Sequence, residues 1–129
     1  MGATGYFTHK DFWKHDMGAG HPECPQRLDA IEDRLLVTGL DLALERREPG
    51  PAALADIELA HDRMHVASLR GLSDALREDM QAGGPGHTAL DPDTSLNAFT
   101  WDAALRAAGA ALEATDAVMA GELENAFCA

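Results

Sequence analysis

The sequence predicts an α/β fold in which helices pack around a short parallel sheet. One observation is that segments with the patterns of strands and of helices alternate along the chain. Another is that residues 125–129 form a short apolar run of the kind found in interior parallel strands. The third is composition, because 129 residues with 46% hydrophobic and 25% charged side chains are typical of one soluble globular domain.

The first part of the chain is expected to contain a strand, a loop and a helix. Residues 4–8 are rich in aromatic and β-branched side chains, which favours a strand. Residues 9–23 have no sustained period and contain several Gly, His and Asp residues, so we expect a long ordered loop. A helix follows, with Pro25 at its first position, apolar residues at helical spacing, and Gly39 at its end.

The middle of the chain predicts one strand and two helices. Residues 40–46 alternate apolar and polar side chains, which favours a half-buried strand over a helix. Residues 52–60 predict a short helix, and residues 64–80 predict a longer one with a single apolar stripe. The Gly and Pro residues at 83–86 then predict a flexible loop.

A polar turn, a long helix and a last strand complete the expected order. Residues 91–97 contain Asp, Ser and Asn, whose side chains stabilise turns and helix starts. Residues 100–120 predict a helix with Thr100 as its N-cap, and its many alanines suggest that it is buried. Its apolar period is formed by Trp101, Leu105, Ala108, Leu112 and Met119. Gly121 ends the helix before the strand at 125–129.

Charge and cysteine content narrow the class of protein. The chain has 22 acidic and 10 basic residues, and its formal net charge of -12 should repel nucleic acid. Cys24 and Cys128 form no CxxC pair and indicate no disulfide framework, which favours a cytoplasmic protein. There is no apolar run long enough for a signal peptide or a membrane span, so no membrane partner is expected.

Two short patterns resemble metal sites, and each lacks a required part. His61 and His65 have the spacing of the HExxH zinc motif, but Asp62 replaces the glutamate and no third ligand follows at a short spacing. Residues 91–102 resemble a calcium loop, but Leu96 occupies the position that requires glycine.

Three histidines in the first loop recur every six residues, a spacing that fits neither a helix nor a strand. We therefore interpret them as loop side chains at a surface or pocket rim; they are His9, His15 and His21. From the residues alone, no catalytic residue and no metal ligand are predicted.

Three segments together resemble the histone deacetylase superfamily, in particular its bacterial and class II-like amidohydrolase members. Residues 20–28, GHPECPQRL, are similar to the GHPExPxR segment of the family. Residues 91–97, DPDTSLN, precede an Ala- and Gly-rich helix, as in the family. Residues 121–127, GELENAF, correspond to a segment that in the family leads into RPPGHH. Together the segments cover nearly the whole chain.

The resemblance implies that residues 1–129 are the N-terminal part of a single catalytic domain with the arginase/deacetylase fold, a parallel sheet wrapped by helices. Such a domain would use zinc to hydrolyse an acetylated amine, either acetyl-lysine or a small acetylated amine. In the family, the tandem histidines, the zinc ligands and the transition-state tyrosine lie beyond the matched segment. We therefore expect this chain to bind no zinc and to be inactive alone.

Two residues receive candidate roles from the resemblance. Asp93 matches a rim aspartate that accepts hydrogen bonds from the substrate backbone, and its alternative role is a turn or helix-cap carboxylate. Arg27 matches an arginine beside an internal channel, where a cation helps an acetate product leave, and its alternative role is a structural salt bridge. His21 and Glu23 are expected to brace the first loop. His65 departs from the family, which commonly has a tyrosine there.

The leading hypothesis is therefore a fragment of a zinc-dependent deacetylase. The alternative is a stand-alone, non-catalytic helical interaction module derived from the same family. The reading frame beyond Ala129 would distinguish the two hypotheses, because only the first requires a tandem-histidine segment there. We also expect the isolated chain to fold poorly, because interior parallel strands need neighbouring strands and helices on both faces. The oligomeric state stays open.

Overall fold

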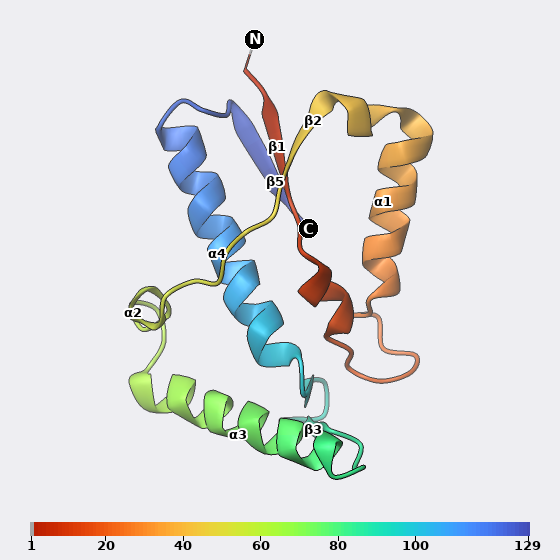
Figure 1. Cartoon of the computed structure of the whole chain (residues 1–129), viewed down its shortest axis with the longest axis vertical. Coiled ribbons are helices and arrows are strands. Elements are labelled where there is room, and N and C mark those ends of the chain that lie inside the picture. The colour runs from red at the N-terminus through yellow and green to blue at the C-terminus, as the bar shows by residue number, and fades with distance from the viewer. Residues whose placement is uncertain (1) are drawn as a thin grey trace.

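A three-stranded parallel sheet lies at the centre of the computed structural model, which describes residues 2–129 (Figure 1). Strand β1 (Thr4–Phe7) is central, with β2 (Leu44–Arg47) on one side and β5 (Asn125–Cys128) on the other. Both neighbours run parallel to β1. The predicted α/β class is therefore confirmed.

Helices cover both faces of the sheet because consecutive side chains of β1 point in opposite directions. Tyr6 and Phe7 are both fully buried. Helix α1 (Gln26–Thr38) covers the Tyr6 face, where the tyrosine hydroxyl donates a 2.8 Å hydrogen bond to Glu32. Helix α4 (Thr100–Met119) packs on the Phe7 face and buries it among alanines and Leu123. Figure 1 shows the two helices on opposite sides of the sheet.

The buried face of α4 differs from the predicted apolar stripe. The side chains that contact the sheet are small, and they allow the strands to approach closely; they are Ala110, Ala114 and Ala117. Leu112 and Met119, which the period placed in the core, are 41% and 81% exposed. The prediction of the helix was right, but its larger residues do not form the face that packs on the sheet.

Gly109 lies where the segment at 49–52 crosses α4. The amide of Ala52 donates to the carbonyl of Leu105 at 2.9 Å, and Nη1 of Arg106 donates to the carbonyl of Pro49 at 2.7 Å. A Cβ atom at position 109 would overlap the carbonyl oxygen of Gly50. The glycine therefore permits a backbone-to-helix contact that no other residue would allow.

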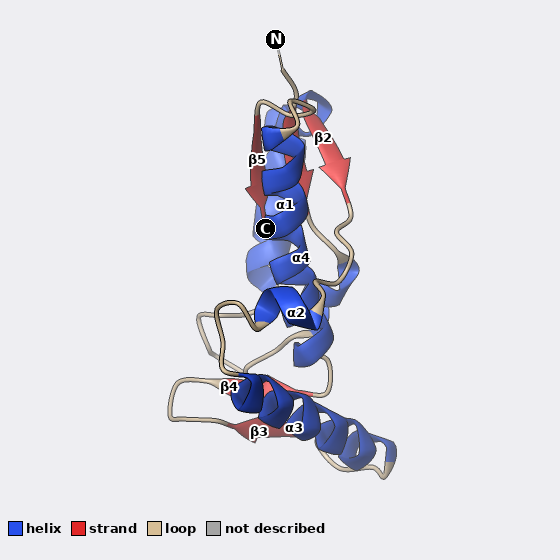
Figure 2. Ribbon diagram, turned by 90° about the vertical axis from the view of Figure 1, so that its left-hand side faces the viewer, coloured by secondary structure: helices blue, strands red, loops and turns tan. Residues whose placement is uncertain are grey.

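A second layer lies at one end of the sheet domain (Figure 2). Helix α3 (Arg63–Gln81) packs there against an antiparallel hairpin of β3 (His87–Ala89) and β4 (Ser95–Asn97). The one-turn helix α2 (Leu54–Ile57) precedes α3. The sequence predicted only a turn in place of the hairpin, because three-residue strands are too short to show an alternating pattern.

Two 3₁₀ helices replace expected loop or strand structure. Helix η1 (Lys10–Lys14) occupies part of the predicted loop, and Nδ1 of His9 accepts the amide hydrogen of Asp11 at its start. Helix η2 (Leu40–Ala43) follows Gly39 directly, so the strand predicted at 40–46 begins only at Leu44. Leu42 is 92% exposed, which shows that the alternation there does not report a buried face.

Strand β5 is more exposed than an interior strand. It pairs with β1 along one edge, and within residues 2–129 no strand pairs with the other edge. Phe127 stacks on Tyr6 but remains 50% exposed. The expectation of a buried last strand is therefore wrong for this chain. None of the helices within residues 2–129 combines the length and apolarity needed to cross a bilayer.

Candidate functional site

A cavity of about 450 Å³ opens near the carboxyl end of β5. Its wall on α4 consists of small side chains and Thr100. The polar side chains that line it come from the first loop, the start of α1 and β5; they are His15, Glu23, Cys24, Arg27 and Cys128. Ligands of open α/β sheets bind at the carboxyl ends of the strands, so this cavity is the candidate functional site.

The structure places Arg27 on the wall of this cavity, in the first turn of α1. The residue is exposed, and its guanidinium has no ion pair with any residue in the range 2–129. The salt bridge considered from the sequence is thus not formed within this range. Arg27 is available as a cation at the site.

Asp93 lies in the loop that joins β3 and β4, with its side chain 95% exposed. The loop is closed by Asp91, whose Oδ1 accepts the amide hydrogens of Asp93 at 2.8 Å and of Thr94 at 2.7 Å. These contacts form an Asx turn, the structure that the polar sequence favoured over a calcium loop. The Asp93 carboxylate is consequently presented to solvent on a fixed backbone.

His21 connects the first loop to this hairpin. Its Nδ1 accepts the amide hydrogen of Glu23 at 3.0 Å, so the neutral ring carries its proton on Nε2. Nε2 lies 3.0 Å from the carbonyl oxygen and 3.2 Å from Oδ1 of Asp93, and it donates to this pair of acceptors. Residues 20–23 (GHPE) and residues 91–97, two of the segments that resemble the family, are therefore joined through His21 and Asp93.

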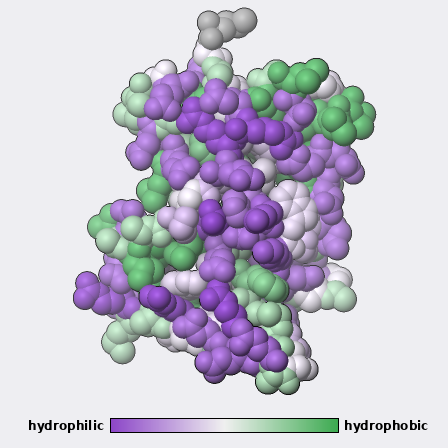
Figure 3. Space-filling view, in the orientation of Figure 1, coloured by the Kyte–Doolittle hydropathy of each residue, from purple (hydrophilic) through white to green (hydrophobic). Residues whose placement is uncertain are grey.

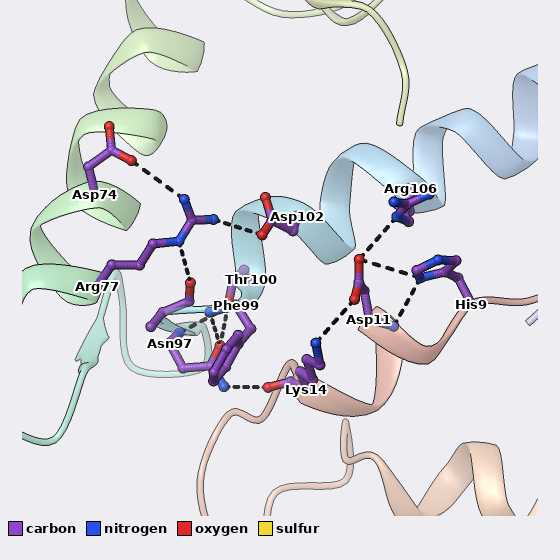
Figure 4. A network of polar contacts seen from close by, with 11 residues as sticks. His9, Asp11, Lys14, Asp74, Arg77, Asn97, Phe99, Thr100, Asp102 and Arg106 are labelled. Atoms are coloured by element: carbon purple, nitrogen blue, oxygen red, sulfur yellow. Dashed lines mark hydrogen bonds and ion pairs between the residues drawn. The ribbon is translucent and has the colours of Figure 1, made fainter. Parts of the chain in front are cut away.

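A second connection joins η1, β4 and the start of α4 (Figure 4). Nδ2 of Asn97 donates to the carbonyl of Lys14 at 2.7 Å, and its Oδ1 accepts the amide hydrogen of Phe99 at 2.9 Å. Phe99 occupies the N-cap position without a side-chain cap, so the prediction of Thr100 as N-cap is wrong. The Thr100 hydroxyl instead contacts Asn97 and Nδ1 of His15, the latter at 2.8 Å.

The ring of His15 lines the cavity, and its burial lowers its pKa, although Glu23 and Asp16 oppose the shift. His15 is therefore neutral at neutral pH. The contact between His15 and Thr100 links residues 85 positions apart in the sequence, and no local pattern could have revealed it. The Asn97–Thr100 contact, in contrast, is a local arrangement at a helix start that sequence inspection could have found.

The remaining histidines lie apart from the cavity wall. His9 is buried and caps η1, beside an ion pair between Arg106 and Asp11 at 3.0 Å. His61 and His65 are exposed, with ring centroids 5.9 Å apart, and they border a second cavity of about 210 Å³ between α3 and α4. Helix α3 begins at Arg63, so His61 lies outside it and the two histidines do not share one helix.

The described residues do not provide a metal site. Within residues 2–129, no three side chains of His, Cys, Asp or Glu lie close enough together to hold a metal ion. These residues do not fit a zinc centre, and no step of zinc chemistry is assigned to them.

Comparison with known proteins identifies the family. The sequence profile described as "Histone deacetylase domain" matches residues 21–129. A protein of Archaeoglobus fulgidus named "Probable deacetylase" is 34% identical over 127 residues, which cover 96% of this chain and 32% of that protein. The "Histone deacetylase-like amidohydrolase" of Pseudomonas aeruginosa is 32% identical over 109 residues, which cover 84% of this chain and 26% of that protein.

A solved structure and a human relative agree with this result. The crystal structure of the HDA15 HD domain superposes with a TM-score of 0.84 and covers 99% of this chain and 35% of that one. At 20% identity this likeness shows the fold alone. Human "Polyamine deacetylase HDAC10" is 29% identical over 126 residues, which cover 95% of this chain and 18% of that protein. This chain spans about a third or less of the length of these relatives.

The fold and the cavity define the structural class of the chain, and the sequence comparisons define its family. The class is a parallel α/β sheet wrapped by helices, with a cavity at the carboxyl end of a strand. Because the family profile covers residues 21–129, the chain belongs to the histone deacetylase family, and its fold is a part of the deacetylase fold.

Proposed function

We propose that this chain is the N-terminal part of the catalytic domain of a zinc-dependent deacetylase. The observation that carries the proposal is the continuous match of residues 21–129 to the histone deacetylase domain. Its support includes relatives named as deacetylases, which are about three times as long or longer. The proposed reaction is hydrolysis of an acetylated amine. An acetylated lysine and an acetylated polyamine are the two candidate substrates, the second suggested by the human relative's name.

In this proposal Asp93 contacts the substrate at the rim. Its carboxylate is exposed, and its backbone is fixed by hydrogen bonds with Asp91 and His21. A carboxylate can accept two hydrogen bonds from backbone amides, and such charge-assisted bonds are stronger than neutral ones. A fixed acceptor at the rim orients the substrate before reaction, which lowers the entropic barrier to catalysis.

Arg27 is proposed to act on the product. From α1 it contributes a guanidinium to a cavity whose opposite wall, on α4, is made of alanines and Thr100. A guanidinium donates hydrogen bonds to carboxylates in a planar, paired geometry. An acetate ion that enters this cavity would therefore find one strong donor, and Arg27 favours its departure from the place of reaction.

Zinc enters this proposal only through segments outside the described residues. When it is bound, zinc polarises the amide carbonyl and activates a water molecule. Since residues 2–129 do not fit a zinc site, the part proposed for this chain is to bind substrate and product.

The alternative function is a non-catalytic interaction module. One observation favours it: apolar side chains gather at the end of α1 and on η2, and Figure 3 shows this patch at its upper right. The exposed residues are Leu36, Val37, Leu40 and Leu42. Exposed apolar patches mark contact surfaces, either with another protein or with a further part of the same fold.

An acetate-release assay separates the two functions. The product of the whole reading frame that contains this chain is compared with the isolated chain, on an acetyl-lysine peptide and on an acetylated polyamine. We expect acetate only from the whole product, and no stoichiometric zinc in the isolated chain. A reading frame that lacks a tandem-histidine segment would favour the interaction module. One tightly bound zinc ion in the isolated chain would overturn the assignment and direct attention to His61 and His65.

A further inference from the structure

The second cavity, of about 210 Å³, lies where the helical layer meets the start of α4. Helix α2, the start of α3 and the first half of α4 surround it, and β4 adds one side chain (Figure 1). Its wall is mainly aliphatic. The aliphatic lining residues larger than alanine are Ile57, Val66, Leu69, Leu96 and Leu105. Apolar cavities hold water poorly, so this lining favours an apolar occupant.

The volume of this cavity limits the size of that occupant. Pockets for drug-sized ligands measure about 300–1,000 Å³. An apolar protein cavity of about 150 Å³ holds one benzene molecule. A cavity of about 210 Å³ therefore has room for one six-membered ring with a short substituent.

The lining also favours an aromatic ring over an aliphatic group. Trp101 on α4, His61 before α3 and His65 in α3 bring three ring systems to the wall. The two imidazoles have centroids 5.9 Å apart and planes tilted by 35°, so they do not stack flat on each other. Aromatic pairs in offset or edge-to-face contact gain stability beyond the area that they bury.

The polar groups of the wall can donate hydrogen bonds to an anion. Within residues 2–129, no Asp or Glu side chain lines this cavity. His61 and His65 are exposed, and an imidazole carries one N–H when neutral and two when protonated. The indole nitrogen of Trp101 can only donate. An acceptor at the border of the cavity is therefore suited to this wall, and beside exposed histidines it keeps its contact with water.

The carboxylates next to the two histidines in the sequence have other partners. Oδ1 of Asp62 accepts the amide hydrogen of Met64 at 2.7 Å, and Glu58 forms an ion pair with Arg63 at 3.2 Å. The formal net charge of -12 opposes the approach of an anion. At physiological ionic strength, however, charges more than about 8 Å away are largely screened. The groups at the cavity wall therefore decide whether an anion binds.

The second cavity and the candidate functional site share one turn of α4. Thr100 and Ala104 line both cavities. The Thr100 hydroxyl accepts the amide hydrogen of Asn97 at 2.9 Å and contacts Nδ1 of His15 at 2.8 Å. An occupant of the second cavity thus contacts the turn that holds His15.

We propose that the cavity between α3 and α4 is a second binding site, and that its ligand is a small aromatic carboxylate. The ring enters the apolar cavity and packs against Trp101. The carboxylate stays at the border, where it accepts hydrogen bonds from His61 and His65. This site is separate from the cavity near the carboxyl end of β5, and its proposal does not rest on the proposed function.

Binding of 4-fluorophenylacetate, followed by ¹⁹F NMR, tests the proposal in the product of the whole reading frame that contains this chain. We expect saturable binding with a Kd on the order of 1 mM, as for a ligand of about ten non-hydrogen atoms. Excess phenylacetate should displace the probe, and the same concentration of acetate should not. The neutral 4-fluorophenylacetamide should bind about three- to tenfold more weakly, because it lacks the charged acceptor.

Two substitutions locate the bound probe. Ala108→Leu fills the cavity from α4 and should weaken binding by roughly tenfold or more. Ala111→Leu is the matched control, because Ala111 is exposed on the same helix and lines neither cavity. His65→Ala removes one exposed donor and leaves the aliphatic wall intact. It should weaken binding of the acid about three- to tenfold and binding of the amide by less.

Each result decides one part of the proposal. Absence of saturable binding, or equal binding by Ala108→Leu and Ala111→Leu, would overturn the site. Displacement by acetate would place the probe elsewhere and overturn it as well. If Ala108→Leu does not fold, His65→Ala still decides, since an unchanged preference for the acid over the amide would remove the histidines from the site. These measurements do not depend on acetate release, so failure of the proposed function is distinguishable from failure of this inference.

Discussion

Replacement of Gly109 by alanine tests the way α4 packs. In an ordinary helix this change stabilises by about 1 kcal/mol, because glycine loses more backbone entropy on folding. At this position the new Cβ would overlap the carbonyl oxygen of Gly50 and lie 3.1 Å from the amide nitrogen of Ala52. The segment at 49–52 would have to move away from the helix.

The cost of that movement can be worked from its contacts. Overpacking costs about 1–3 kcal/mol. The movement also strains two hydrogen bonds, from Ala52 to Leu105 and from Arg106 to Pro49, worth about 1 kcal/mol each if lost. If both bonds are lost, then against the gain of about 1 kcal/mol in helix propensity the net expectation is a destabilisation of roughly 2–4 kcal/mol.

Gly71 provides the matched control. It lies within α3, and a Cβ built there has no neighbouring atom within 4 Å. Gly71→Ala should therefore raise the free energy of unfolding by about 1 kcal/mol. Urea unfolding followed by far-UV circular dichroism compares both variants with the parent chain. If Gly109→Ala were as stabilising as Gly71→Ala, the close approach of the segment at 49–52 to α4 would be refuted.

Three further predictions concern titration and exposed surface. Burial, and next the hydrogen bond to Glu32, raise the pKa of Tyr6 to about 12. This residue is the only tyrosine in the sequence, so the absorbance of tyrosinate should rise with a midpoint near pH 12. The free energy of unfolding should fall from about pH 10, where the unfolded phenol ionises, to about pH 12, and Tyr6→Phe should remove this part of the decrease. An absorbance midpoint near pH 10 would refute the raised pKa of Tyr6. Burial alone would raise the pKa of Asp11, but its hydrogen bonds, first that from Arg106, outweigh burial and lower the pKa. The carboxylate therefore stabilises the fold above its unfolded pKa, and this stabilisation is lost as the pH falls through the lower folded pKa. Arg106→Gln should therefore move the acid-unfolding midpoint to higher pH, and an unchanged midpoint would contradict this coupling. Because one edge of β5 is unpaired and Phe127 is half exposed, the isolated chain should bind an apolar dye there. A sharp cooperative melt without dye binding would contradict the expectation that the isolated chain folds poorly.

Local patterns predicted the elements that are long or bounded by special residues. Helix α3 buries Val66 and Leu76, two apolar residues of the predicted stripe, together with the polar Ser73. Gly39 ends α1 with φ of 75°, a backbone conformation that favours glycine. Periodicity reports which residues are apolar, however, and not which neighbours cover them. Leu112 and Met119 therefore fit the period of α4 while remaining exposed.

The candidate site was only partly accessible from the sequence. Asp93 and Arg27 received their roles from resemblance, and these roles stay predictions. The contacts of His15 with Thr100 and of His21 with Asp93 join residues 85 and 72 positions apart, which only the fold brings together. The Gly50–Gly109 approach is equally nonlocal, since sequence inspection treats a glycine inside a helix as a weak point rather than as a contact.

The central claim, that this chain supplies the substrate-binding rim of a deacetylase, is tested most directly by one substitution. Asp93→Asn keeps the size of the side chain and removes its charge, and Glu124→Gln, beside the amino end of β5, is the charge-matched control. In the product of the whole reading frame, loss of charge-assisted hydrogen bonds to the substrate should lower kcat/KM for acetate release roughly 10- to 100-fold in Asp93→Asn. The control should retain the parent value. Equal activity of Asp93→Asn and the parent, or no acetate release by the parent, would contradict the claim.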